Sequence, residues 1–225
     1  MTEKTSIIVP VWAPTAALRD LTLGFLNNLQ STIYKSNVEL IVVESETCVV
    51  TEADIYIATP NVDGFGHAVN LGIKLASHEW IAVIGNDITL QEGWLPKLQS
   101  VFNSIPGCGF LHPADQTDGE PPLEGECWWP MVLTKRSVLD NVGLLDEQLS
   151  WRYHDQDISI RAAMKGYRVI RTSEVRVQHL NGATWNSMQE DKRKKHSDEE
   201  GEIILKRYGC SMYHQWYVQH IKRLV

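Results

Sequence analysis

Residues 80–95, WIAVIGNDITLQEGWL, decide the fold of this chain. Residues 81–84 form an apolar run without a polar interruption, which is typical of a strand that is buried on both faces, and residues 90–95 open a helical pattern. Asn86 and Asp87 stand between them, where the buried strand ends. Because a strand of this kind needs helices on both faces of its sheet, the stretch predicts an α/β protein.

The segments before this stretch also alternate between strand and helix patterns. Strands are predicted over residues 5–12, 38–45 and 53–60, and helices over residues 15–33 and 67–78, with a loop at 61–66. The first helix has apolar residues on or near one face: Leu18, Leu21, Leu26, Leu29 and Ile33. We therefore expect a mostly parallel central sheet flanked by helices. Ligands bind such sheets beyond the carboxyl ends of the strands, where Glu44, Asp63 and Asp87 should gather.

The second half of the chain is less regular. Residues 105–133 are rich in Gly and Pro and are predicted to form a long loop between strands. A short helix and turn are expected over 135–151, a helix from His154 to Gly166, a strand that ends at His179, and a charged helix over 186–209.

Composition limits the class of protein. The chain has 225 residues, of which 43% are apolar, so it suits one sizeable α/β domain, alone or with an appendage. Its four cysteines are scattered without a CxxC pair, and no apolar run approaches the length of a membrane span. The first residues lack the pattern of a secretory signal, so a cytoplasmic location is expected. A formal charge of -7 disfavours a general nucleic-acid coat.

Asp87 is placed where a cation could bind. A carboxylate at the end of a buried strand is held rigidly and suits a hard divalent cation that keeps positions open for substrate phosphates. The alternative is that Asn86 and Asp87 form a turn or cap the next helix.

Several segments occur in an order that resembles the family 2 glycosyltransferases of GT-A fold. They are SIIVPVW, ELIVVES, NVDGFGHAVNLGIKLASHEWIAVIGNDITLQEGWL, VLTKRSVLDNVGLLDE, WRYHDQDISIRAAMKGYRVI and VQHLNGATW. The resemblance runs from about residue 5 to about residue 186. It implies a Rossmann-like GT-A domain over residues 1–186 and a helical extension over 187–225. It also implies transfer of a sugar from a UDP-, GDP- or dTDP-sugar to a hydroxyl acceptor with inversion.

The resemblance implies a donor site as well. Its residues would be Pro10, Val11, Glu44, Asp63, Gly66, Asn70, Asn86 and Asp87. A carboxylate at Glu44 can accept hydrogen bonds from ribose hydroxyls or a base N–H, and Gly64 and Gly66 would let their loop approach the nucleotide. The run GFGHAVNLG does not match a dinucleotide fingerprint, because Val69 occupies the position of the third glycine.

The metal motif of the family is Asp-X-Asp, and the aligned triplet here is Gly85-Asn86-Asp87, which lacks the first carboxylate. His179 resembles a second metal ligand of the family. Asp87 and His179 would together hold Mn²⁺ or Mg²⁺ against the diphosphate, where the cation acts as a Lewis acid.

The base and the acceptor contacts are implied by two further segments. YHDQDISIR resembles the EDxD segment of the family, with His154 at the position of the glutamate, and it makes Asp155 the expected base. His154 can also accept the proton, and the first turn of a helix favours a carboxylate whether or not it does chemistry. Asp157 is expected to orient the helix start. Trp128 and Trp129 are candidate acceptor contacts, since indole faces stack on sugars.

The basic run at residues 192–195 has two interpretations. It is either a solvated helix surface or a contact for an anionic acceptor such as DNA, a lipid head group or a phosphorylated glycan, approached through Lys192, Arg193, Lys194 and Lys195. The accepting hydroxyl could belong to a glycan, a lipid-linked molecule, a protein or a modified nucleic acid. The aromatic and basic tail at 213–225 could add contacts or close a homodimer.

Two other functions compete with this one. A nucleotidyltransferase would need a glycine-rich loop after the first strand, and residues 10–20 contain no glycine. A nucleotide-sugar-binding module without turnover remains open, because Gly85 and His154 replace two acidic residues of the family pattern.

Overall fold

The computed structural model describes residues 3–33, 37–45, 52–60, 64–117, 124, 125, 127, 129–180, 182–210 and 216. The strands are β1 (Thr5–Trp12), β2 (Val38–Ser45), β3 (Ile55–Thr59), β4 (Trp80–Ile84), β5 (Ile88–Thr89), β6 (Cys108–Asp115), β7 (Met131–Lys135) and β8 (Arg168–His179). The helices are α1 (Ala16–Thr32), α2 (Gly64–Leu75), α3 (Trp94–Ser104), α4 (Arg136–Val142), α5 (His154–Met164), α6 (Ala183–Ser187) and α7 (Glu190–Tyr208).

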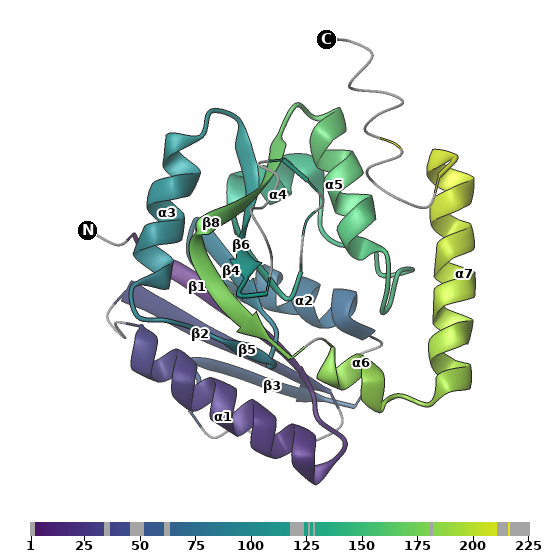
Figure 1. The fold of residues 1–225 in the computed structure, drawn as a ribbon, viewed down its shortest axis with the longest axis horizontal. Helices are drawn as coiled ribbons and strands as arrows, with labels where there is room; N and C mark the ends of the chain where they lie inside the picture. The colour runs from purple at the N-terminus through teal and green to yellow at the C-terminus, as the bar shows by residue number, and fades with distance from the viewer. Residues whose placement is uncertain are drawn as a thin grey trace.

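One eight-stranded sheet runs through the molecule in the order β3-β2-β1-β4-β7-β6-β8-β5 (Figure 1). Strands β3, β2, β1 and β4 pair in parallel, and β6 pairs in parallel with β8. Strands β7 and β5 pair antiparallel with their neighbours. The predicted α/β architecture is therefore confirmed as a mixed sheet flanked by helices. Strands β1, β2, β4 and β8 all end at the same edge of the sheet.

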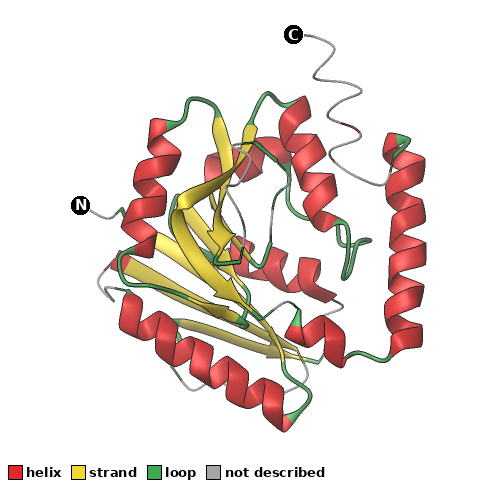
Figure 2. Cartoon of the chain, in the orientation of Figure 1, coloured by secondary structure: helices red, strands yellow, loops and turns green. Residues whose placement is uncertain are grey.

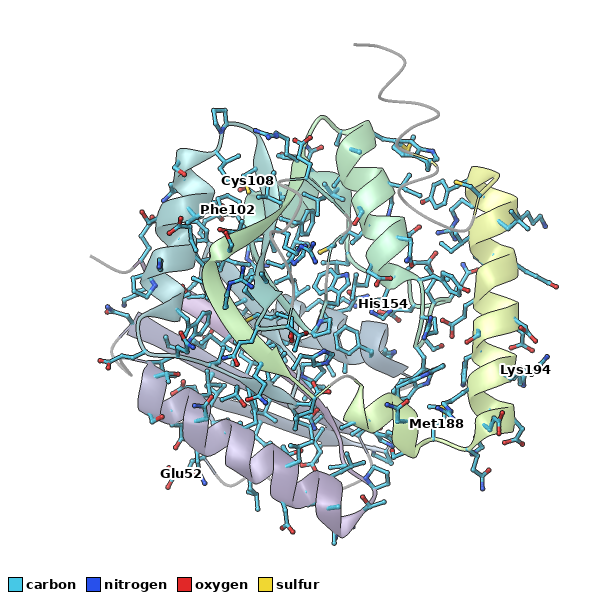
Figure 3. The ribbon with its side chains drawn as sticks, viewed as in Figure 1. Glu52, Phe102, Cys108, His154, Met188 and Lys194 are labelled. Atoms are coloured by element: carbon cyan, nitrogen blue, oxygen red, sulfur yellow. The ribbon has the colours of Figure 1, made fainter. Side chains whose placement is uncertain are left out.

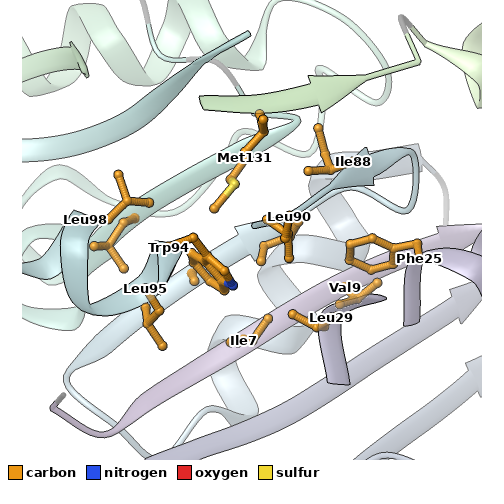
Figure 4. Packing of buried hydrophobic residues seen from close by; sticks show 14 of the residues in the cluster. Ile7, Val9, Phe25, Leu29, Ile88, Leu90, Trp94, Leu95, Leu98 and Met131 are labelled. Atoms are coloured by element: carbon orange, nitrogen blue, oxygen red, sulfur yellow. The ribbon is translucent and has the colours of Figure 1, made fainter. Parts of the chain in front are cut away.

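The alternation of side chains along the strands builds one core on each face of the sheet. In β1, Ile7 and Val9 face a core shared with α1 and α3, whereas Ile8 faces a core shared with α2, α4 and α5. Figure 2 shows these helices on the two sides of the strands. In the first core, Phe25 of α1 and Trp94 of α3 close over the sheet (Figure 4). Both faces are buried, which explains the uninterrupted apolar run in β4.

The prediction of a long loop over residues 105–133 is wrong at both ends, since β7 begins at Met131 and β6 occupies the first part of that segment. Strand β6 runs through it, and Phe110 and Leu111 are fully buried. The two residues that suggested a loop, Gly109 and Pro113, lie at irregularities in the pairing of β6 with β8. Gly and Pro are tolerated at such bulges, so they mark a bent strand and not a connection.

Two helix boundaries also differ from the sequence prediction. Helix α2 begins at Gly64, so Gly64 and Gly66 lie within it and not in a preceding loop. The short strand β5 follows Asp87, and α3 begins only at Trp94. Strand β5 forms because Ile88 pairs with His179 of β8. This is a long-range contact, and a strand of two residues is too short to be predicted from its sequence.

The charged extension forms α7, which stands beside α5 on the side of the molecule opposite α3 (Figure 1). Trp216, from the C-terminal tail, is buried in a small cluster with Ile160 and Cys210 of the same chain. Among the described residues, no helix is both long and apolar enough to cross a membrane.

A pair of glycine substitutions tests the packing of α2 on the sheet. A Cβ at Gly72 would lie 2.4 Å from Cγ2 of Ile8, whose branched side chain cannot turn away easily. We expect Gly72→Ala to lower the free energy of unfolding by about 1–3 kcal/mol in urea denaturation, since overpacking a core costs this much.

Gly24→Ala is the matched control. Gly24 lies inside α1, and a Cβ there meets nothing within 4 Å. This variant should be neutral or more stable by up to about 1 kcal/mol, because Ala favours a helix. Equal effects of the two substitutions would contradict the close approach of α2 to β1.

Candidate active site

A cavity of about 960 Å³ opens at the edge of the sheet where the parallel strands end. This volume lies near the upper end of the range of about 300–1,000 Å³ that is usual for small-molecule sites. From the strand ends it is lined by Pro10, Val11, Trp12, Ser45, Gly85, Asn86, Asp87 and His179. From the helices and their connections it is lined by Phe65, Trp129, Trp151, Arg152, Tyr153, His154, Asp155, Trp185, Lys192 and His196, among others.

Asp87 and His179 meet at the strand-end side of the cavity. Nε2 of His179 lies 3.2 Å from Oδ2 of Asp87, and the two side chains are only 10% and 9% exposed. The amide of Ala183 also donates to Oδ2 of Asp87 over 3.3 Å. Pairing of β5 with β8 fixes this approach, because it sets Ile88 beside His179 and so places Asp87 next to the histidine.

These two side chains fit a divalent cation. An imidazole nitrogen and a carboxylate oxygen converge there, and a cation of the Mg²⁺ or Mn²⁺ type often takes only one or two protein ligands and completes its shell with water and phosphate. No cluster of three or more His, Cys, Asp or Glu side chains suited to a metal occurs within the described ranges. The protein would thus supply two ligands and leave the remaining positions open.

Gly85 and Asn86 have structural partners. The amide of Gly85 donates to the carbonyl of Pro130 over 2.7 Å, and Asn86 Nδ2 donates to Thr22 Oγ1 over 2.8 Å. A Cβ at Gly85 would lie 3.2 Å from Asp87 Oδ1, so a larger residue there would crowd the carboxylate. Through its bond to Thr22, Asn86 connects the turn after β4 to α1.

His154 and Asp155 occupy the start of α5, across the cavity. The ring of His154 stacks on Phe65 with centroids 4.9 Å apart, and it is 8% exposed. Its Nδ1 atom has no hydrogen-bond partner in the described part of the chain. Burial lowers the pKa of His154, against the opposing effect of the neighbouring Asp155, so the ring is neutral at pH 7. Asp155 is partly exposed and lines the cavity.

The segment before α5 is held by α7. Glu200, which is 3% exposed, accepts hydrogen bonds from the amides of Trp151 (3.2 Å) and Arg152 (2.6 Å), and it also contacts Nδ1 of His196. Burial raises the pKa of Glu200, although these amides oppose the shift. Tyr153, the next residue, has a left-handed backbone with φ of 61°. The carboxylate therefore fixes the segment that leads to the candidate base.

Asp157 is completely buried and connects α5 to the chain before it. Its Oδ2 accepts a hydrogen bond from Arg161 Nε over 2.8 Å. Arg161 also donates to the carbonyls of Val142 and Leu144, over 2.8 Å in each case. This places the end of α4 against α5, in agreement with the structural role predicted for Asp157.

The end of α7 joins the same network. Arg207 donates to Asp157 Oδ1 and to Asp146 Oδ2, both over 2.6 Å, and the hydroxyl of Tyr208 donates to Asp157 Oδ1 over 2.6 Å. Burial and the bond to Asp157 raise the pKa of Tyr208 to about 12. Burial alone would raise the pKa of Asp146, but the Gln148 amide and Arg207 hold it below the ordinary Asp value.

The structure brings only some of the predicted site residues together. Pro10, Val11, Asn86, Asp87, His154, Asp155 and His179 line the cavity. Glu44 is buried and accepts a hydrogen bond from Tyr56 over 2.6 Å, and it does not line the cavity. Trp129 reaches the lining but is 1% exposed, packed near Phe65 and Phe110. Asp63 and Trp128 lie outside the described residues.

Gly66 and Asn70 face the segment that follows α4. A Cβ at Gly66 would lie 3.4 Å from the carbonyl of Leu149. Asn70 donates to the carbonyl of Leu145 over 2.8 Å and accepts from its amide over 3.0 Å. These contacts explain both residue types by packing and hydrogen bonding within the chain.

Several lining residues were not predicted as site residues by the sequence. Trp12, Trp151, Arg152, Trp185 and His196 all line the cavity, and Glu200 supports it from behind. The signal available in the sequence was the residue type of Trp151 and Trp185, because an indole can either stack on a sugar or pack in the core. Nothing in the local charge pattern of α7 distinguishes Glu200 from its exposed neighbours.

The comparisons with known proteins agree with this geometry. The family model described as glycosyl transferase family 2 matches residues 6–136, more than half of the chain. The chain belongs to glycosyl transferase family 2. No curated protein gives a significant match to this chain.

Solved structures show the same fold at low identity. The mannosyltransferase PcManGT from Pyrobaculum calidifontis, in complex with GDP-Man and Mn²⁺, has a TM-score of 0.67 and 16% identity, and the match covers 92% of this chain and 65% of that one. GalNAc-T7 with UDP, GalNAc and Mn²⁺ has a TM-score of 0.68 and 10% identity, with coverage of 99% and 57%. S. aureus TarS 1–349 with UDP-GlcNAc has a TM-score of 0.62 and 16% identity, with coverage of 90% and 66%. This chain therefore spans about three fifths of the length of these structures.

Substitution of Arg207 tests the docking of α7. Arg207→Ala removes two bonds to carboxylates and leaves Asp157 buried with fewer partners. We expect a loss of about 1–3 kcal/mol in the free energy of unfolding at pH 7, which is the usual size for hydrogen bonds to charged groups. Urea denaturation measures it.

The pH dependence of this loss has a definite sign. Because the pKa of Asp146 is lowered in the folded protein, its contribution is present above the ordinary Asp pKa and is lost as the pH falls through the lower folded value. The difference between wild type and Arg207→Ala should shrink toward pH 3. Lys206→Ala, at an exposed neighbouring position, should change stability by less than about 0.5 kcal/mol. An equal loss in both variants would contradict the network.

Proposed function

We propose that the chain transfers a sugar from a nucleoside-diphosphate sugar to a hydroxyl acceptor with inversion at the anomeric carbon. The proposal is carried by one observation: a single cavity lies between two pairs of polar side chains. Asp87 and His179 lie at its strand-end side, and His154 and Asp155 lie at the start of α5. Membership of glycosyl transferase family 2 supports the same activity.

The donor would bind at the strand ends, with its diphosphate near Asp87 and His179. These two residues would hold Mn²⁺ or Mg²⁺, which supplies charge compensation to the departing diphosphate. The presence of Mn²⁺ in the PcManGT and GalNAc-T7 complexes supports this choice. Pro10, Val11 and Ser45, also on this side, offer the surface for the nucleoside. The base could be that of UDP, GDP or dTDP.

Asp155 is the proposed general base. It lines the cavity and is partly exposed, so its carboxylate can reach an acceptor hydroxyl. In a single displacement the hydroxyl oxygen forms a bond to the anomeric carbon, the bond from that carbon to the phosphate oxygen breaks, and Asp155 takes the hydroxyl proton. Neutral His154, stacked on Phe65, borders the same space and keeps Asp155 free of a nearby positive charge from its ring.

Melting experiments test the donor site. UDP, GDP, dTDP and CDP are each added with Mn²⁺, Mg²⁺ or a chelator. A ligand at 100 times its Kd stabilises the folded state by about 2.7 kcal/mol, which is about 5–11 °C in Tm for a domain of this size. We expect one nucleotide to give such a shift with a cation and a much smaller one with chelator.

Two variants locate the binding. Asp87→Asn should abolish the cation-dependent part of the shift, whereas Asp140→Asn, at an exposed position of α4, should retain it. If no nucleotide raises Tm, or if Asp87→Asn responds like the wild type, the proposed donor site is wrong.

The base is tested by transfer kinetics with the donor that binds. Asp155→Asn should lower kcat about 10²- to 10⁴-fold with nucleotide affinity unchanged, the usual contribution of a positioned base. His154→Gln should lower kcat less and should keep the same pH profile between about pH 6 and 8. If His154 were the base, its pKa would set the acidic limb of the pH profile, below the ordinary histidine value because the ring is buried. That limb would then be absent in His154→Gln.

A second candidate function is binding without turnover. Gly85 and His154 favour it, since they replace two acidic residues of the family pattern. A protein of this kind would bind a nucleotide but release no nucleoside diphosphate from any sugar donor, and Asp155→Asn would change nothing.

A further inference from the structure

Two cations face the cavity without an anionic partner. Arg152 and Lys192 both line it, and neither forms an ion pair with any carboxylate in the described residues. By contrast, Lys194 and Lys195 of the same helix are paired with Asp198 and Glu199. Arg152 and Lys192 thus place two positive charges at one cavity. They mark this part of the cavity for an anion.

Indole rings border Arg152 and line the same cavity. Arg152 lies over the ring of Trp185, 5.2 Å from its centroid. Trp151 packs edge-on against Trp12 with centroids 5.3 Å apart, and the ring of His196 is 6.4 Å from that of Trp151. Both Trp151 and Trp185 are partly exposed and line the cavity, so each offers surface to a ligand. Aromatic surfaces of this type bind the apolar faces of sugar rings.

The wall formed by α6 and the first half of α7 contributes no carboxylate to the lining. Its lining residues are Thr184, Trp185, Ser187, Met188, Lys192 and His196, together with Gln189. Figure 3 places Met188 between α6 and α7 and Lys194 on the outer side of α7. Lys192 is therefore the member of the basic run that the fold turns toward the site.

This wall adjoins the candidate base. Arg152 and Tyr153 directly precede His154 and Asp155, and Glu200 of α7 holds the amides of Trp151 and Arg152. A ligand bound to the wall would thus have its hydroxyls near the start of α5, while the α6 end of the wall meets Asp87 through the amide of Ala183.

We propose that Arg152, Lys192, Trp151 and Trp185 form an acceptor subsite for a sugar that carries a phosphate or a carboxylate. This inference rests on the proposed function and assigns its acceptor class. The indoles hold the sugar ring, and the two cations hold the anionic group, so that a hydroxyl of the sugar meets Asp155. Arg donors in particular match the two oxygens of a phosphate or carboxylate.

The observations favour an anionic sugar over a nucleic acid. Nucleic-acid grooves track many phosphates with many cations. Here two cations, Arg152 and Lys192, line the cavity, and Lys194 and Lys195 of α7 are paired with Asp198 and Glu199. Two cations beside indole rings match a ligand that has one anionic group next to a sugar ring.

Binding to the full chain is measured by isothermal titration with glucose 6-phosphate, glucuronate and glucose as probes. We expect both charged sugars to bind and glucose to bind much more weakly. Arg152→Gln and Lys192→Gln should each weaken binding of the charged sugars about threefold or more, as expected for a charge contact at a partly exposed site. The ranking of glucose 6-phosphate and glucuronate identifies phosphate or carboxylate as the preferred anion.

Lys194→Gln is the matched control, since Lys194 lies in the same helix, is paired with Asp198 and points outward. It should leave binding unchanged. Equal binding of glucose, equal weakening in Lys194→Gln, or failure of both charged sugars to bind would overturn the subsite. Tighter binding of a short single-stranded oligonucleotide with the same dependence on Arg152 and Lys192 would replace it with a nucleic-acid site.

Titration of UDP and GDP with Mn²⁺ into the same variants separates this inference from the proposed function. Unchanged nucleotide affinity in Arg152→Gln and Lys192→Gln supports an acceptor role, whereas a parallel loss would assign the two cations to the donor diphosphate and overturn the subsite. Binding of charged sugars in a chain that binds no nucleotide would leave the subsite standing and refute the glycosyltransferase mechanism.

Discussion

The site depends on one buried carboxylate, Asp157. It is completely excluded from water and is bonded by Arg161 and Tyr208 as well as by Arg207. A buried charge that loses a partner is strongly destabilising, so the elements that carry these partners are held together. Through Arg161 the carboxylate fixes the chain after α4, and through Arg207 and Tyr208 it fixes the end of α7. Helix α5, which begins with the candidate base, lies between them.

Docking of α7 gives the charged extension a role in the site. Without α7, the amides of Trp151 and Arg152 would lack Glu200, and the cavity would lose the wall that contains Lys192 and His196. The strand-end side of the cavity, by contrast, is built by pairing within the sheet, which places Asp87 beside His179. The two sides therefore have different structural origins. This suits a donor pocket set by the sheet and an acceptor pocket set by the extension.

The sequence predicted what local patterns control. Buried strands such as β1, β2 and β4 were predicted from their apolar runs, and α1 was predicted from the apolar residues on or near one of its faces. Strand β6 was missed because Gly109 and Pro113 resemble loop residues until their bulges are seen. Asp157 was expected to be structural, since first-turn carboxylates often are. Glu200 could not be singled out, because its burial is created by long-range contacts with Trp151 and Arg152.

The most direct test is a crystal of the chain grown with a nucleoside diphosphate and Mn²⁺ and measured at the manganese absorption edge. The account predicts an anomalous peak in contact with both Asp87 and His179, with the diphosphate on its open side and the nucleoside toward Pro10 and Val11. A nucleotide bound elsewhere, or a manganese peak that touches neither side chain, would contradict the proposed donor site.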